Sequence, residues 1–188
     1  MNETKLLGTH ITNDLKWDKN TSEIVKKAFK RMQILYKAVN FTRNPQDLKR
    51  IYKIFVRSIL EHSAVVWHSG LTQKNILALE RVQKSAVKLI MGAKYKDYND
   101  GLKRLNLENL EKRRDNLCLK FAKNCLKTEK VKGIFKKHES NHKMKKRKTE
   151  LFQEKMIKTK RYKNSSIPYM VKLLNKEAQE KNLQMNNL

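Results

Sequence analysis

Residues Ile51 to Gly92 read IYKIFVRSILEHSAVVWHSGLTQKNILALERVQKSAVKLIMG, and the rest of the chain is organised around this stretch. It contains two segments in which apolar side chains recur every three or four residues, the spacing that places them on one face of an α-helix. Inward positions are expected at Leu48, Ile51, Tyr52, Phe55, Ile59, Ser63 and Val66 in the first segment, and at Ile76, Leu79, Val82, Ala86, Val87 and Ile90 in the second.

Start and stop signals bound these two helices. We expect the first to end near Trp67 and the second to begin after Thr72, whose hydroxyl can cap it, and to end at Gly92. The turn His68-Ser69-Gly70-Leu71 between them is so short that the two helices must run antiparallel.

A further helix is predicted upstream, from Ser22 to Val39, with Thr21 or Ser22 as its cap. Its inward stripe would contain Ile24, Ala28, Met32, Leu35 and Val39. Asn44-Pro45 marks the next helix start, because proline is favoured at the first helical position. The sequence therefore predicts a mostly α fold, a small antiparallel helical bundle.

The N-terminal residues 4 to 12 have the β-branched composition of a strand. A lone strand is not stable, so we expect it to pair with strands of a sheet that lie upstream of this chain. A native N-terminal strand within a small domain is the alternative.

Beyond Gly92 we expect a polar segment with a short helix from Tyr98 to Leu105. A longer helix should follow, with Leu107, Leu110, Leu117, Cys118, Phe121, Ala122 and Cys125 facing inward and with Lys112, Arg113 and Arg114 facing outward.

Residues 127–163 carry 15 basic and 4 acidic side chains, which is typical of a solvated, partly disordered tail. Pro168 can then open a helix in which Met170, Val171 and Leu174 pack.

These patterns give a division into four parts. Residues 1–18 would be a strand and connector, 19–126 the helical bundle, 127–163 a basic flexible segment, and 164–188 a short C-terminal helix and tail. Cys118 and Cys125 are seven residues apart on one predicted helix, so they are expected to be small buried residues in a reducing compartment.

Charge indicates the kind of partner. The 188 residues include 44 Lys and Arg against 18 Asp and Glu, a net charge of +26. Such a charge favours a polyanion, nucleic acid first and an anionic membrane second. Because no run approaches the roughly 18 apolar residues of a transmembrane helix and no signal peptide is evident, we expect an intracellular protein, nuclear or cytoplasmic, without a membrane partner.

The candidate nucleic-acid-binding residues are basic side chains that lie off the apolar stripes or in the tail. They are Lys26, Lys27, Lys30, Arg31, Lys49, Arg50, Lys53, Lys145, Lys146, Arg147 and Lys148. Since no recognition motif is present, binding to RNA or DNA should have low sequence specificity.

Other side chains are interpreted structurally. His138 and His142 have the spacing of a metal pair but no third ligand, so no metal or other cofactor is expected. His62 and His68 should make hydrogen bonds at helix ends. Trp17 and Trp67 should anchor the packing of the bundle rather than stack on bases.

A family resemblance rests on motifs spread along the chain. Leu60-Glu61, Val66-Trp67 and the order Leu79-Glu80, Gln83, Ala86, Ile90-Met91-Gly92 resemble runs in jockey-like non-LTR retrotransposon reverse transcriptases, in the region after the catalytic domain. Leu6-Leu7-Gly8 with Leu15 and Trp17, Arg113-Arg114, and the run from Arg161 to Asn175 are similar to further motifs of that family. His62 and Lys88 stand where an aromatic residue and an arginine are commoner.

The resemblance covers most of the chain outside residues 127–149, and it implies the thumb and post-thumb region of an RNA-directed DNA polymerase, with the polymerase domain upstream. Adjacent aspartates that hold the metals of such enzymes are missing, because Asp14, Asp18, Asp47, Asp97, Asp100 and Asp115 stand apart. The chain is therefore expected not to be an enzyme by itself. The alternative is an independent small basic helical protein that binds nucleic acid or another protein.

Without those carboxylates, we predict that purified protein given template-primer, nucleotides and magnesium incorporates no nucleotide. Primer extension on a sequencing gel measures this. Reproducible extension by the purified chain would contradict it.

Overall fold

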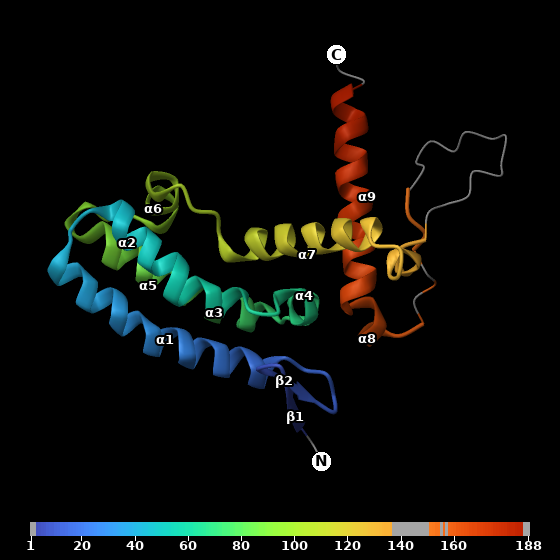
Figure 1. Ribbon diagram of the computed structural model, residues 1–188, viewed down its shortest axis with the longest axis horizontal. Coiled ribbons are helices and arrows are strands. Elements are labelled where there is room, and N and C mark those ends of the chain that lie inside the picture. Colours follow the sequence, from blue (N-terminus) through green and yellow to red (C-terminus); the bar gives the residue numbers. More distant parts are fainter. Residues whose placement is uncertain (1–2, 137–150, 155, 157, 186–188) are drawn as a thin grey trace. The chain divides into compact units, whose positions relative to one another are not determined.

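The computed structural model describes residues 3–136, 151–154, 156 and 158–185 (Figure 1). It is mostly α-helical, as predicted, and its residues fall into two compact units. The first unit contains Met1–Ala64 and Leu71–Arg114, and the second contains Val65–Gly70 and Asp115–Leu188. Residues 19–126, predicted as one helical bundle, are thus divided between the two units, with one division after Arg114.

The chain opens with a β-hairpin. Strand β1 (Glu3–Leu6) pairs antiparallel with β2 (Thr9–Thr12), and Glu3 lies opposite Thr12. Leu7 and Gly8, with φ angles of 46° and 84°, form the turn, where positive φ values match the twist of a hairpin. The expectation of a single strand is thus wrong, because the segment folds back and pairs with itself.

Helix α1 (Asp18–Phe41) starts four residues before the predicted Ser22. Trp17, half-buried, stands at the cap position without a side-chain cap hydrogen bond, and Thr21 is buried inside the helix. Neither Thr21 nor Ser22 is therefore the cap. The predicted inward stripe is confirmed at its four buried positions, Ile24, Ala28, Met32 and Leu35, whereas Val39 is half-buried.

The segment predicted as one helix ending near Trp67 is interrupted. It contains α2 (Pro45–Ile51), a π-helical turn η1 (Tyr52–Arg57), α3 (Ser58–Glu61), α4 (Ala64–Trp67) and the 3₁₀ turn η2 (His68–Gly70). The break lies at His62–Ser63, where Ser63 has a φ of 52°. The predicted helix start at Asn44-Pro45 is confirmed, and the structure adds a cap, since Asn44 Oδ1 accepts a hydrogen bond from the Gln46 N–H at 3.0 Å.

The π-helical turn changes which side chains face inward. The buried residues recur every four positions, at Leu48, Tyr52, Val56, Leu60 and Ala64. In a regular α-helix each four-residue step rotates by roughly 40°, so such a row would drift off its face. The wider π turn absorbs this drift. Phe55 is 42% exposed and Val66 49% exposed, so these two predicted inward positions are wrong, whereas Ile51, Ile59 and Ser63 are half-buried.

The remaining helices of the first unit follow the predicted bounds closely. They are α5 (Gln73–Met91), the 3₁₀ turn η3 (Gly92–Lys94) and α6 (Tyr98–Leu105). Thr72 caps α5 and Gly92 follows its last residue, as predicted. Leu79, Val82, Ala86, Val87 and Ile90 are buried as predicted, whereas Ile76 is half-buried. Helix α1 packs against α5 and lies alongside α2, η1 and α3 (Figure 1).

The second unit has a core of its own. Helix α7 (Leu110–Lys127) starts in the first unit, and its later residues Cys118, Ala122 and Cys125 pack with Phe135, Phe152, Met170, Val171 and Leu174. The last three belong to α9 (Ser166–Met185), and they are buried as predicted. The 3₁₀ turn η4 (Lys132–Ile134) and α8 (Lys160–Lys163) complete the described elements.

Residues 127–163 are therefore not simply a solvated tail, because Phe135 and Phe152 lie in this core. The Asn175 side chain fixes the second of them: its Oδ1 accepts from the Phe152 N–H at 2.9 Å and its Nδ2 donates to the Phe152 carbonyl at 3.1 Å. Two expectations for α7 are also wrong, since Phe121 is 47% exposed and Arg114 is fully buried.

The π-helical register can be tested by a pair of substitutions. We predict that Leu60→Ala lowers the free energy of unfolding by about 2–5 kcal/mol, because this side chain is fully buried. Phe55→Ala should cost less than about 1 kcal/mol, because the ring is substantially exposed. Urea unfolding followed by circular dichroism measures both. A larger loss for Phe55→Ala than for Leu60→Ala would contradict the register.

Candidate nucleic-acid interface

The outer face of α1 carries the first set of predicted basic residues. Lys26, Lys27, Lys30 and Arg31 are all exposed, and α1 contains only two acidic residues, Asp18 and Glu23. Lys26 and Lys30 are four residues apart and share one side of the helix, and so do Lys27 and Arg31. The Glu23 carboxylate lies 3.1 Å from Lys26 Nζ, and its hydrogen bond with this lysine lowers the pKa of Glu23.

Lys27, Lys30 and Arg31 keep their charge uncompensated. No carboxylate among the described residues lies within ion-pairing distance of these three cations. Backbone phosphates bind to such exposed cations without any reading of the base sequence. The exposed face of α1 is therefore suited to a phosphate backbone.

The second predicted set lies on α2 and η1, beside α1 in the same unit. Lys49 and Lys53 are half-buried and four residues apart, whereas Arg50 is exposed and lies 3.8 Å from Asp47 Oδ1. The pKa of Lys53 is lowered, first by partial burial and then by repulsion from Arg57, Lys49 and Arg113. The structure thus groups Lys49 and Lys53 with Arg57 and Arg113, which are not among the predicted nucleic-acid-binding residues.

Those arginines meet at Glu61. Arg113 Nε lies 2.7 Å from Glu61 Oε1, and Arg57 Nε lies 3.4 Å from the same oxygen. The contact of Arg57 with Glu61 follows from their four-residue spacing. The approach of Arg113 depends on the fold, so no local signal in the sequence could have found it.

A buried amide, that of Gln83, connects several elements of the first unit. The Gln83 Oε1 accepts from the Tyr52 hydroxyl at 2.7 Å, and its Nε2 donates to the Tyr98 hydroxyl and to the Glu108 carbonyl, both at 2.9 Å. Burial raises the pKa of the Tyr52 hydroxyl and of the Tyr98 hydroxyl, so both stay protonated at neutral pH. This network joins η1, α5 and α6 to the segment before α7.

Glu80 extends this hydrogen-bond network to the start of α7. Both of its carboxylate oxygens accept from the Leu110 N–H, at 3.2 and 3.1 Å, at the start of α7. Tyr98 also donates to Glu80. A carboxylate at a helix N-terminus is favourable because of the unpaired N–H groups and the helix dipole there. These hydrogen bonds therefore fix the relative positions of the helices in the unit that carries the basic residues.

The predicted roles of the histidines at helix ends are confirmed. His62 Nε2 lies 3.0 Å from the Leu7 carbonyl, next to the hairpin turn. His68 Nε2 lies 2.7 Å from Asp115 Oδ1, which also accepts a hydrogen bond from the Tyr169 hydroxyl, and the His68 and Tyr169 rings pack edge to face. In the second unit these contacts hold the Val65–Gly70 segment to α7 and α9. Trp67 is fully buried, as expected for a packing anchor.

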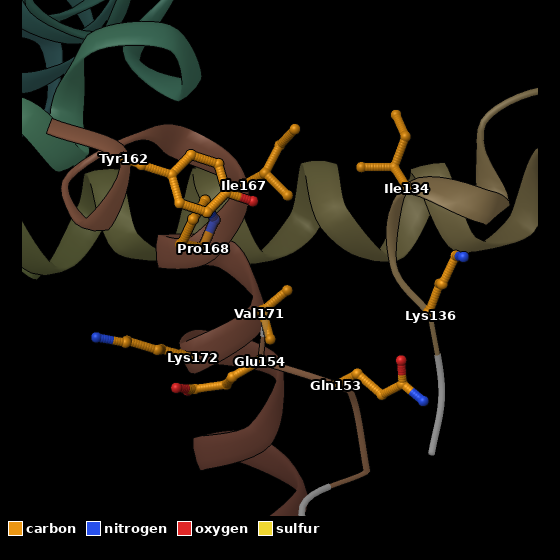
Figure 2. Close-up of a pocket in the computed structure, with 9 residues that line it drawn as sticks. All are labelled: Ile134, Lys136, Gln153, Glu154, Tyr162, Ile167, Pro168, Val171 and Lys172. Atoms are coloured by element: carbon orange, nitrogen blue, oxygen red, sulfur yellow. The ribbon is translucent and has the colours of Figure 1, made fainter. Parts of the chain in front are cut away.

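The second unit contains a small hollow between Ile134 and the start of α9 (Figure 2). Tyr162, Ile167 and Pro168 line one end, and Lys136 and Gln153 line the other. Its volume is about 30 Å³, close to the space that a single water molecule needs.

Several predicted residues lie outside the described part of the chain. These are His138, His142, Lys145, Lys146, Arg147 and Lys148. Within residues 3–136, 151–154, 156 and 158–185, no three His, Cys, Asp or Glu side chains come close enough to hold a metal ion. In the same residues, no helix has the length and apolar character needed to cross a membrane.

Comparison of the chain with protein-family models, with curated proteins and with solved structures finds no match in any of the three.

Proposed function

We propose that this chain binds the phosphate backbone of RNA and DNA duplexes with low sequence specificity, through the helices of its first unit. We further propose that it is the non-catalytic thumb and post-thumb part of a jockey-like non-LTR retrotransposon reverse transcriptase. The observation that carries the binding proposal is the exposed face of α1, where Lys27, Lys30 and Arg31 have no carboxylate partner among the described residues.

The contacts among motif residues support the proposed origin. Gln83, in the motif from Leu79 to Gly92, accepts a hydrogen bond from Tyr52, and Glu80 of the same motif caps the helix that starts at Leu110. Glu61 of the Leu60-Glu61 motif pairs with Arg113 of the Arg113-Arg114 motif. Several residues that carry the resemblance are therefore hydrogen-bond or ion-pair partners within the first unit, although they stand far apart in the sequence.

Low specificity follows from the type of contact. Lysine and arginine side chains on an exposed helix face fix the position of a phosphate backbone, and sequence is read by contacts to base edges. A thumb-like clamp must move along its duplex, and phosphate contacts permit this because every base pair presents the same charges.

The hairpin offers a surface for the proposed upstream polymerase domain. All four residues of β1 are exposed, and Leu6 and Leu7 are 59% and 85% exposed. An exposed edge strand with apolar side chains is a ready surface for pairing or packing with another protein segment. The same feature favours the second candidate function, an independent protein-interaction module.

A salt titration of the full chain tests the binding proposal. We predict that a Gln substitution at each of Lys26, Lys27, Lys30 and Arg31 makes the slope of log affinity against log salt shallower by at least about two, because each lost phosphate contact removes about 0.9. Fluorescence anisotropy with a labelled duplex measures the slope, and circular dichroism checks that the helices are retained.

The matched control removes the same charge from exposed lysines of the second unit, with Gln at Lys120, Lys163, Lys172 and Lys176. This variant should keep a slope near that of the unsubstituted chain. Equal losses in the two variants would mean that binding follows total charge, and the proposed interface on α1 would be wrong.

A further inference from the structure

A row of cations runs beside the buried row of α2, η1 and α3. Lys49, Lys53 and Arg57 follow one another at four-residue steps, and Glu61 is the next in the series. Each of these side chains lies one position after a buried residue, Leu48, Tyr52, Val56 and Leu60. The π-helical turn that keeps the buried row on one face therefore keeps this row on one line as well.

The row holds more positive charge than its carboxylates can balance. Arg57 and Arg113 share the single carboxylate of Glu61, and Lys112 lies 3.9 Å from Glu108. No carboxylate within the described part of the chain is in ion-pairing range of Lys49 or Lys53. The three cations of the row and the neighbouring Lys112 and Arg113 thus share two carboxylates, those of Glu61 and Glu108.

The guanidinium groups of Arg57 and Arg113 have N–H donors that are not used in hydrogen bonds with the described residues. Arg113 uses its Nε and one terminal nitrogen on Glu61, at 2.7 and 3.4 Å, which leaves three of its five N–H groups. The Arg57 side chain is only 15% exposed, and no acceptor among the described residues hydrogen-bonds it. Partial burial lowers the pKa of Arg57, while Glu61 opposes this effect. The guanidinium N–H groups of Arg57 can therefore donate to an oxygen of a ligand that reaches this surface.

We infer that Lys53, Arg57 and Arg113 form a binding site for one phosphate group, with Glu61 holding the two guanidinium groups in place. Planar guanidinium groups match the oxygen geometry of phosphate, and a lysine adds a point charge. Glu61 is the positioning residue, and its negative charge also weakens phosphate binding. If the proposed function holds, the phosphate belongs to the nucleic-acid backbone, so this source of the ligand rests on that proposal.

The test uses four single variants of the full chain, Lys53→Gln, Arg113→Gln, Glu61→Gln and the control Lys84→Gln, an exposed lysine of α5. The first probe is inorganic phosphate, followed by ³¹P line broadening. Lys53→Gln and Arg113→Gln should each weaken phosphate binding by about fivefold or more. Glu61→Gln should tighten it, because the negative charge is removed while the amide oxygen can still accept from the guanidinium groups, and Lys84→Gln should leave it unchanged.

The effect of Glu61→Gln on phosphate affinity, opposite to that of Lys53→Gln and Arg113→Gln, distinguishes a binding site from an ordinary ion-pair cluster. Phosphate binding by Lys53→Gln and Arg113→Gln equal to that of Lys84→Gln would overturn the inference, and so would weaker binding by a folded Glu61→Gln. If circular dichroism shows that Glu61→Gln is unfolded, Lys53→Gln decides, because its side chain makes no ion pair with the described residues.

A second probe, a labelled duplex, distinguishes the source of the phosphate. A salt slope that becomes shallower by about one in Lys53→Gln, but not in Lys84→Gln, assigns the site to the nucleic-acid backbone. An unchanged duplex slope with weakened inorganic phosphate binding assigns it to free phosphate. Failure of the unsubstituted chain to bind the duplex would overturn the proposed function alone, because the inorganic probe judges the site independently.

Discussion

The first unit depends on one buried amide. Gln83 is fully buried, and its oxygen and nitrogen are hydrogen-bonded to Tyr52, to Tyr98 and to the Glu108 carbonyl. A buried amide costs several kcal/mol in an apolar environment when its hydrogen bonds are missing, so the helices that provide these partners must meet in one arrangement. The amide therefore acts less as a source of net stability than as a constraint on helix register.

This constraint also determines which charged side chains meet on the surface of the first unit. Because the Glu108 carbonyl is fixed on Gln83 and the Leu110 N–H on Glu80, the first turns of α7 have a defined position, and Arg113 reaches Glu61. Arg57, four residues before Glu61, then shares this carboxylate. A polar network in the core thus decides which cations come together on the surface.

The sequence predicted what depends on local rules. The helix start at Asn44-Pro45, the Thr72 cap and the short helix from Tyr98 to Leu105 follow from turn chemistry and apolar spacing, and all are confirmed. It missed what depends on tertiary contacts. Apolar spacing could not show the π-helical turn that exposes Phe55, and charge alone placed Arg114 outside although it is buried. The core around Phe135 and Phe152 was missed because few apolar residues surround them in a basic segment.

The most direct measurement of the central claim is lysine acetylation footprinting of the full chain with and without a duplex, read by mass spectrometry. If the helices of the first unit hold the backbone, the duplex should slow acetylation of Lys27, Lys30 and Lys53, while Lys172 and Lys176 of the second unit remain reactive. Protection confined to lysines outside the first unit, with Lys27, Lys30 and Lys53 as reactive as in the free protein, would contradict the account.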